Sequence, residues 1–177
     1  MKSDSNITIK EVINSDELKK FVMFPHTLYK DSKYWVAPII KEELEVLNKE
    51  TNPVFNNAIA HYFLAYIDGE IVGRIAALIN WIEVKDLKKK KVRFGWFDFI
   101  DDQNVSKALL EKVIEIGKKN NLEFIEGPVG FSNMDKAGML IKGFEKKNTM
   151  ITLYNYSYYQ DHMKAHGYSK LAEWVEY

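Results

Sequence analysis

Residues 61–99 constrain the fold more than any other part of the chain, because they have the pattern of three consecutive strands. The segments 61–67, 71–80 and 92–99 are rich in aliphatic and aromatic residues. Asp68-Gly69 joins the first two, and this dipeptide is the strongest short-range signal for a β-hairpin. Residues 71–80 are apolar on both faces apart from Arg74, which is typical of a central strand covered on both sides. We therefore expect a sheet with packed layers on both faces.

The elements around this meander alternate between strand and helix. Helix signals begin at Ser15, which we expect to act as the cap, and Pro25 is expected to kink or restart that helix. The sequence predicts further helices over 40–47, from 101–104 to 120–121, and over 156–166, and further strands over 7–10, 122–126, 149–153 and 169–177. This order predicts an α/β fold in which a mixed, mostly antiparallel sheet is flanked by helices.

Composition narrows the function classes. The 177 residues are 46% hydrophobic, which suits one domain with a sizeable core. Lys+Arg and Asp+Glu are balanced at 25 each, so no overall charge favours nucleic acid or an anionic membrane, and we expect neither as a partner. The run at 88–91 is interpreted as a solvated lysine loop. A polar N-terminus without a signal peptide favours a cytoplasmic location.

Several chemistries lack the residues they need. The chain has no cysteine, which excludes disulfides, cysteine-ligated zinc and thiol nucleophiles. His162 and His166 have the i, i+4 spacing of metal ligands, but no third ligand accompanies them in the sequence. We therefore expect no metal site.

The order of elements resembles the GNAT (N-acetyltransferase) fold over nearly the whole chain. The final helix and strand resemble that family's closing segment, where an aromatic-bearing helix runs into Gly-Phe or Gly-Tyr. The motifs that resemble a bacterial branch of GNAT-like proteins are Phe24-Pro25 with Leu28-Tyr29-Lys30, Gly73-Arg74-Ile75-Ala76-Ala77, Gly127-Pro128 with Phe131-Ser132-Asn133, Tyr154-Asn155 with Tyr158-Tyr159, and His166-Gly167-Tyr168. Members of that branch carry a second similar domain, so residues 1–177 are expected to form one domain that matches the N-terminal half of such a protein.

The resemblance implies acetyl-CoA, or another acyl-CoA, as co-substrate. Its pantetheine arm would lie between the strands at 92–99 and 122–126, and its pyrophosphate would bind backbone N–H groups at the start of the next helix. The residues placed there are Trp96, Phe97, Phe99, Asn104, Val105, Ser106 and Lys107. The chain departs from the family in having no glycine in this loop, where Asp101 and Asp102 stand instead. Asp102 as a helix cap would occupy donors that a phosphate needs, and Lys107 would offset part of the repulsion.

The resemblance also suggests two catalytic residues. Asp98 ends its strand near the implied amine site, where a carboxylate could take a proton. Glu83 and Glu126 are weaker alternatives for this role. If Asp98 has no catalytic role, it is a solvated acid at the end of a strand. Tyr159 could protonate the leaving thiolate. The family's tyrosine usually lies one turn later, at the position of Met163, so the alternative is a tyrosine that only packs in the core.

Candidates for acceptor binding lie outside this strand. Arg74, within an apolar strand, needs a partner, either a ligand's carboxylate or phosphate or a structural acid such as Glu126. Ser132 and Asn133, with Asn155, are expected to form one wall of an acceptor pocket. An ordinary surface loop is the alternative.

Three functions remain open on the sequence. The first is acyl-CoA-dependent transfer of an acetyl or other acyl group to an amine of a small molecule or protein. The second is a GNAT-like domain that binds a ligand without acyl transfer. The third is an interaction module, because a single strand after Gly167 would leave a sheet edge for a second copy of the chain or a second domain to cover.

Overall fold

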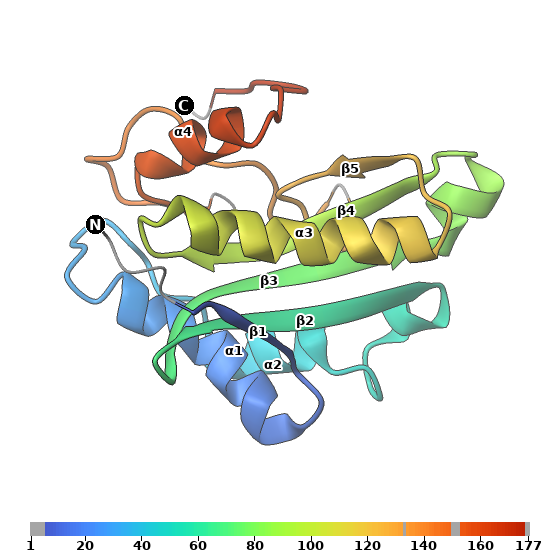
Figure 1. Cartoon of the computed structure of the whole chain (residues 1–177), viewed down its shortest axis with the longest axis horizontal. Coiled ribbons are helices and arrows are strands. Elements are labelled where there is room, and N and C mark those ends of the chain that lie inside the picture. Colours follow the sequence, from blue (N-terminus) through green and yellow to red (C-terminus); the bar gives the residue numbers. More distant parts are fainter. Residues whose placement is uncertain (1–5, 133, 150–152, 176–177) are drawn as a thin grey trace.

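The computed structural model describes residues 6–132, 134–149 and 153–175. In these residues one five-stranded sheet has the order β1-β2-β3-β4-β5 (Figure 1). The strands are β1 (Thr8–Glu11), β2 (Ala58–Ile67), β3 (Glu70–Asn80), β4 (Lys91–Phe99) and β5 (Phe124–Glu126). The pairs from β1 to β4 are antiparallel and β4–β5 is parallel, which confirms the mixed, mostly antiparallel sheet.

Helices cover both faces of the sheet. The helices are α1 (Ser15–Leu28), α2 (Ile40–Leu47), α3 (Gln103–Lys119) and α4 (Tyr158–Ala165), with a 3₁₀ turn, η1 (Pro53–Asn56), before β2 and a π-helical turn, η2 (Ile82–Asp86), after β3. α1 and α2 pack on one core, and α3 and α4 on the other. β3 supplies Ile75 and Ala77 to one core and Ala76 and Leu78 to the other. It is the doubly covered central strand that its sequence predicts.

A β-bulge interrupts β4 halfway along. Arg74 pairs with Asp98 and Ala76 pairs with Gly95, so two residues of β4 lie opposite one of β3. Trp96, in this bulge, has a φ of 45°, a value that few non-glycine residues adopt. β5 pairs only with the start of β4, from Lys91 to Arg93. The bulge therefore separates a half of β4 that pairs with β5 from a half that does not.

Helix α1 differs from its prediction at both ends. Its N-cap is Asn14, whose side chain accepts a hydrogen bond from the Glu17 N–H at 2.9 Å, and not Ser15. The helix also continues through Pro25 to Leu28. Proline leaves the carbonyl oxygen four residues earlier without its helical donor. Here that oxygen belongs to Phe21, and the Arg74 side chain donates to it at 2.9 Å, so the helix continues without loss of that hydrogen bond.

Two other predictions were wrong in the described residues, and a third falls largely outside them. The final strand expected at 169–177 is absent from its described residues, 169–175, where Leu171 is 82% exposed. β5 has only three residues and offers few backbone groups to an added strand. The expected strand at 149–153 falls largely outside the described residues, and neither end of it is in a strand. In the lysine run, Lys91 is 5% exposed rather than solvated, because Glu83 and Glu126 pair with its ammonium.

No described helix combines the length and the apolar character that crossing a bilayer requires.

Candidate active site

Four polar side chains meet at the C-terminal end of β4. They are buried: Tyr29 is 1% exposed, Tyr159 2%, Arg74 6% and Asp98 9%. Arg74 pairs with Asp98 through Nε and NH2, which lie 2.8 and 2.7 Å from Oδ2. The Tyr29 hydroxyl donates to Asp98 Oδ1 at 2.8 Å and lies 2.8 Å from the Tyr159 hydroxyl. The carboxylate is thus shared between a guanidinium on one oxygen and phenols on the other.

Different elements bring these four residues together. Arg74 and Asp98 face each other across β3 and β4 as register partners. Tyr29 is the C-cap of α1, and its N–H donates to the Pro25 carbonyl at 2.8 Å. Tyr159 lies in the first turn of α4. The bulge of β4 sits immediately before Asp98, so the strand reaches this cluster shifted by one residue against β3.

The electrostatics of the cluster favour neutral phenols. Burial raises the pKa of Tyr29 and that of Tyr159 well above 10, and the negative charge of Asp98 raises both further. Both hydroxyls therefore carry their protons near neutral pH. The cluster therefore holds one carboxylate beside two phenols that keep their protons.

Known structures resemble this arrangement of elements over almost the whole chain. An aminoglycoside acetyltransferase from an uncultured soil metagenomic sample, in complex with sisomicin, superposes with a TM-score of 0.58 at 14% identity, covering 98% of this chain and 95% of that one. The predicted acetyltransferase of Clostridium acetobutylicum, with acetyl-CoA, also has a TM-score of 0.58, at 13% identity, over 97% of this chain and 95% of that one. The chain has the GNAT fold. The GNAT fold that the order of elements predicted is thereby confirmed.

Two curated proteins are similar in sequence. Protein YghO of Escherichia coli (strain K12) is 31% identical over 172 residues, which are 95% of this chain and 44% of that protein. Bacterial ceramide synthase of Caulobacter vibrioides (strain NA1000 / CB15N) is 25% identical over 176 residues, which are 99% of this chain and 46% of that protein. The chain thus spans less than half the length of either relative. No family model matches the chain.

Helix α4 covers the half of β4 that does not pair with β5, where the resemblance led us to expect the acyl-CoA. The backbone N–H of Phe99 donates to the Tyr159 hydroxyl at 3.2 Å, and its carbonyl oxygen accepts from Tyr158. The rings of Phe97 and Phe99 pack against Tyr159. Trp96 points to the other face, where its Nε1 donates to Glu43 at 2.7 Å. The three β4 residues predicted to line the pantetheine site therefore divide between the two faces.

The start of α3, the expected pyrophosphate site of a GNAT fold, is already hydrogen-bonded within the chain. The Asp102 carboxylate caps the helix by accepting from the Asn104 N–H at 2.8 Å. The N–H groups of Val105 and Ser106 donate to the Asp102 carbonyl at 3.1 and 3.2 Å, and both residues are buried. Lys107 is exposed and lies 4.0 Å from Glu111. An anion would have to displace the Asp102 carboxylate to reach the Asn104 N–H.

Helix α4 lies beside the start of α3 (Figure 1). The His162 ring accepts or donates at both nitrogens: Nε2 lies 2.9 Å from Asp101 Oδ1, and Nδ1 lies 2.8 Å from Ser106 Oγ. His166 Nε2 is also 2.8 Å from Ser106 Oγ. Burial, followed by the nearby His162 and Lys107, lowers the pKa of His166, so its ring is neutral near pH 7. The two histidines are thus a hydrogen-bonded link between α3 and α4, and no described group of side chains is placed to hold a metal ion.

The predicted acceptor residues that the structure describes have partners within the chain. Arg74 has a structural acid as partner, but that acid is Asp98 and not Glu126. The buried Asn155 amide joins two segments, because its oxygen accepts from the Leu140 N–H at 2.6 Å and its nitrogen donates to the Leu140 and Tyr156 carbonyls. The Ser132 N–H donates to Asp135 at 2.8 Å. Asn133 lies outside the described residues.

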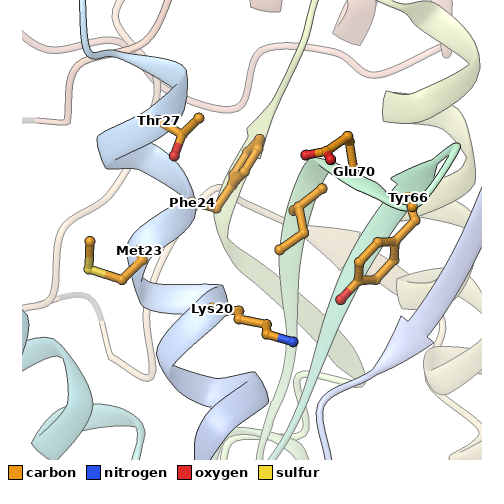
Figure 2. A pocket seen from close by; sticks show the side chains of 8 residues that line it. Lys20, Met23, Phe24, Thr27, Tyr66 and Glu70 are labelled. Atoms are coloured by element: carbon orange, nitrogen blue, oxygen red, sulfur yellow. The ribbon is translucent and has the colours of Figure 1, made fainter.

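Two surface hollows lie apart from the buried cluster. One, of about 330 Å³, runs between α3 and α4 and is lined by Lys107, Leu110, Glu111, Ile114, Ala165, His166 and Tyr168. The other, of about 310 Å³, lies between α1 and the β2–β3 turn. In Figure 2 the Lys20 side chain points across it toward Tyr66. The lining of the first hollow begins at Lys107, one turn into α3, and reaches His166 and Tyr168 at the end of α4.

Tyr29 is the residue of this site that the sequence did not reveal. It lies 69 positions from Asp98 and 130 from Tyr159, and nothing in its local pattern indicates a polar contact. The one available signal was Pro25, since a proline inside a helix marks a carbonyl that needs a donor from elsewhere. That signal leads to Arg74, and through Arg74 to the cluster.

Proposed function

We propose that this domain transfers an acyl group from acyl-CoA to an amine. The observation that carries the proposal is the meeting of the Asp98 carboxylate and the Tyr159 phenol, 3.4 Å apart, at the end of β4 in a GNAT fold. An amine that attacks a thioester must lose a proton, and the leaving sulfur must gain one. A carboxylate beside a protonated phenol provides an acceptor and a donor for these two transfers.

The proposed roles follow from the geometry. The neutral amine attacks the thioester carbonyl, the C–N bond forms and the C–S bond breaks. Asp98 takes the proton from nitrogen, and its side chain keeps 12% exposure through which an amine could approach. Tyr159 gives its hydroxyl proton to sulfur. Arg74 fixes Asp98 Oδ2, so Oδ1 is the oxygen that receives the proton.

The hollow between α3 and α4 is the proposed path of the acyl-CoA. Lys107 lines it and carries the positive charge that phosphates need, and the apolar side chains of Leu110 and Ile114 face the same space. The GNAT-fold neighbours include structures with acetyl-CoA and with a bisubstrate analogue of CoA. Binding requires that Asp102 and α4 give way at the start of α3, because their hydrogen bonds occupy it.

A long-chain amino alcohol is the first acceptor to test. One relative is a bacterial ceramide synthase, and a ceramide is the amide of such an amine. The rings of Trp35 and Tyr154 lie 5.4 and 5.6 Å from the Tyr29 ring beside the cluster, which is an apolar surrounding for an acceptor of this kind.

Calorimetric titration with acetyl-CoA and with palmitoyl-CoA, each compared with CoA alone, tests the first half of the proposal. Release of the CoA thiol in the presence of sphinganine, and of short amines as a matched series, tests the second. Micromolar binding with amine-dependent thiol release is the expected result. Absence of binding at millimolar ligand, together with no thiol release from any amine, would contradict acyl transfer by this domain.

The second candidate function is a GNAT-like domain that binds a ligand or partner without transfer. It is favoured by one observation: Asp102 and α4 together occupy the start of α3, where the fold would otherwise place a pyrophosphate. In this case the titrations remain flat while the domain stays folded.

A further inference from the structure

We infer that Tyr29 is a positioning residue for the proposed transfer, because it joins the proton acceptor Asp98 and the proton donor Tyr159 into one line of hydrogen bonds. This inference rests on the proposed function. Both of its contacts are 2.8 Å long, whereas the direct contact between Tyr159 and Asp98 is 3.4 Å. The shorter route between the two proposed catalytic residues therefore runs through Tyr29.

The direction of the hydrogen bonds is fixed by counting hydrogens. A phenol has one hydrogen to donate, and Tyr29 gives its hydrogen to the Asp98 carboxylate, which can only accept. The hydroxyl contact between the two tyrosines must then be donated by Tyr159. The Phe99 N–H donates to the Tyr159 oxygen at 3.2 Å. The line therefore runs in one direction, from the β4 backbone through Tyr159 and Tyr29 to Asp98.

This line can carry the proton that the proposed reaction moves. The amine gives its proton to Asp98, and Tyr159 gives its proton to the leaving sulfur. Once Asp98 is protonated it can donate, so the Tyr29 hydroxyl turns from Asp98 to the Tyr159 phenolate, passes its proton there and receives the proton that Asp98 holds. One N–H proton has become one S–H proton, one C–N bond has replaced one C–S bond, and all three side chains return to their starting forms.

The ring and the hydroxyl of Tyr29 have separate surroundings. The ring packs among Trp35, Tyr154 and Tyr156, and within the part of the chain that the structure describes the hydroxyl has Asp98 and Tyr159 as its hydrogen-bond partners. Removal of the oxygen alone therefore interrupts the line and leaves the aromatic packing in place.

The test is Tyr29→Phe, with Tyr156→Phe as the matched control. Tyr156 belongs to the same aromatic cluster, but its hydroxyl donates to the Leu28 carbonyl at 3.2 Å and takes no part in the line. With palmitoyl-CoA and sphinganine, we expect Tyr29→Phe to lower kcat about 100-fold while KM for the thioester stays within about threefold. Tyr156→Phe should keep kcat within about threefold. The solvent isotope effect on kcat should reflect several protons in the unaltered chain and in Tyr156→Phe, and one proton in Tyr29→Phe.

A second measurement does not depend on turnover. In proton NMR, the buried Tyr29 and Tyr159 hydroxyls should give slowly exchanging resonances, and Tyr29→Phe should remove one and shift the other. An unshifted Tyr159 hydroxyl would overturn the line itself. Turnover that Tyr29→Phe retains in full would overturn the role of Tyr29 alone. No turnover by the unaltered chain with either thioester and any amine would overturn the proposed function, and the role of Tyr29 with it.

Discussion

The two ends of β4 both bury charge, but they do so with different partners. At the N-terminal end, Lys91 lies 3.2 Å from Glu83 and also pairs with Glu126, and Arg93 lies 2.6 Å from Glu83. At the C-terminal end, a single pair of Arg74 and Asp98 is surrounded by the hydroxyls of two tyrosines.

The two groups differ in whether their side chains only hold elements together or could also move a proton. In the N-terminal group two cations stand against two carboxylates, and every hydrogen bond between them runs from nitrogen to oxygen. A proton moved from Lys91 to a carboxylate would neutralise both partners and remove an ion pair that holds the group together. In the C-terminal group the phenols are neutral donors that can pass a proton and accept another. Ion pairs of the first kind hold η2 and β5 against β4, whereas the second group contains the carboxylate and the phenol of the proposed transfer.

Asp98→Asn should produce the largest effect. The amide removes the negative charge from buried Arg74, so we expect the free energy of unfolding to fall by about 3 kcal/mol, as measured by urea denaturation. It also removes the proposed proton acceptor, and thiol release should fall at least about 100-fold per folded molecule.

Glu83→Gln is the control from the other end of the strand. Glu83 contacts both Lys91 and Arg93, so its loss should destabilise the chain by a similar amount, about 3 kcal/mol. Thiol release per folded molecule should nevertheless stay within about threefold of the unaltered chain, since general acid–base catalysis is not removed. If Glu83→Gln abolishes release while Asp98→Asn leaves it unchanged, the two ends of β4 have been assigned the wrong way round.

Alkaline pH should distinguish the two ends without reference to substrate. The pKa of Tyr29 and that of Tyr159 are raised in the folded chain, whereas an unfolded tyrosine titrates near 10. Above about pH 10 the unfolded chain therefore loses protons that the folded chain keeps, and stability falls by about 1.4 kcal/mol per pH unit for each such phenol. Below pH 10 both states hold these protons and the stability is fully present.

Urea denaturation between pH 9 and 11.5, with tyrosinate absorbance as the second signal, measures this slope. Tyr29→Phe should make this slope shallower by the contribution of one phenol. Glu83→Gln should leave the slope unchanged, because the partners of Glu83 are Lys91 and Arg93. An equal slope in the unaltered chain and Tyr29→Phe would mean that Tyr29 ionises as readily when folded as when unfolded.

The sequence predicted the fold from signals that are local. The Asp68-Gly69 turn, the apolar run of β3 and the helical spacing of 40–47 depend on neighbouring residues, and the structure confirms each. The final strand at 169–177 was wrong because strand formation needs a partner, and the short β5 does not provide one in the described residues.

The site could be predicted only as separate residues. Arg74 stood out as a charge in an apolar strand, and Asp98 as an acid at the end of the next, but no pattern showed that they pair. Their pairing depends on the bulge at Trp96, which sets the β3–β4 register beyond it. Tyr29 joins them from a helix end that is distant in sequence. Contacts of this kind depend on how distant segments of the chain pack together, which no local sequence pattern indicates.

The smallest expected effect lies just beyond β4, at the cap of α3, and has opposite signs for stability and binding. Asp102→Ala removes the capping carboxylate, so we expect a loss of about 1 kcal/mol in the free energy of unfolding. The same change frees the Asn104 N–H and removes a negative charge from the proposed phosphate site, so the affinity for acyl-CoA should rise.

Asn14→Ala, which removes the cap of α1, should lower the free energy of unfolding by a similar amount and leave that affinity unchanged. Calorimetric titration of both variants with palmitoyl-CoA measures the difference. An affinity that rises in neither variant, or in both, would mean that the start of α3 is not where the phosphates bind, and the active end of β4 would then be reached from another direction.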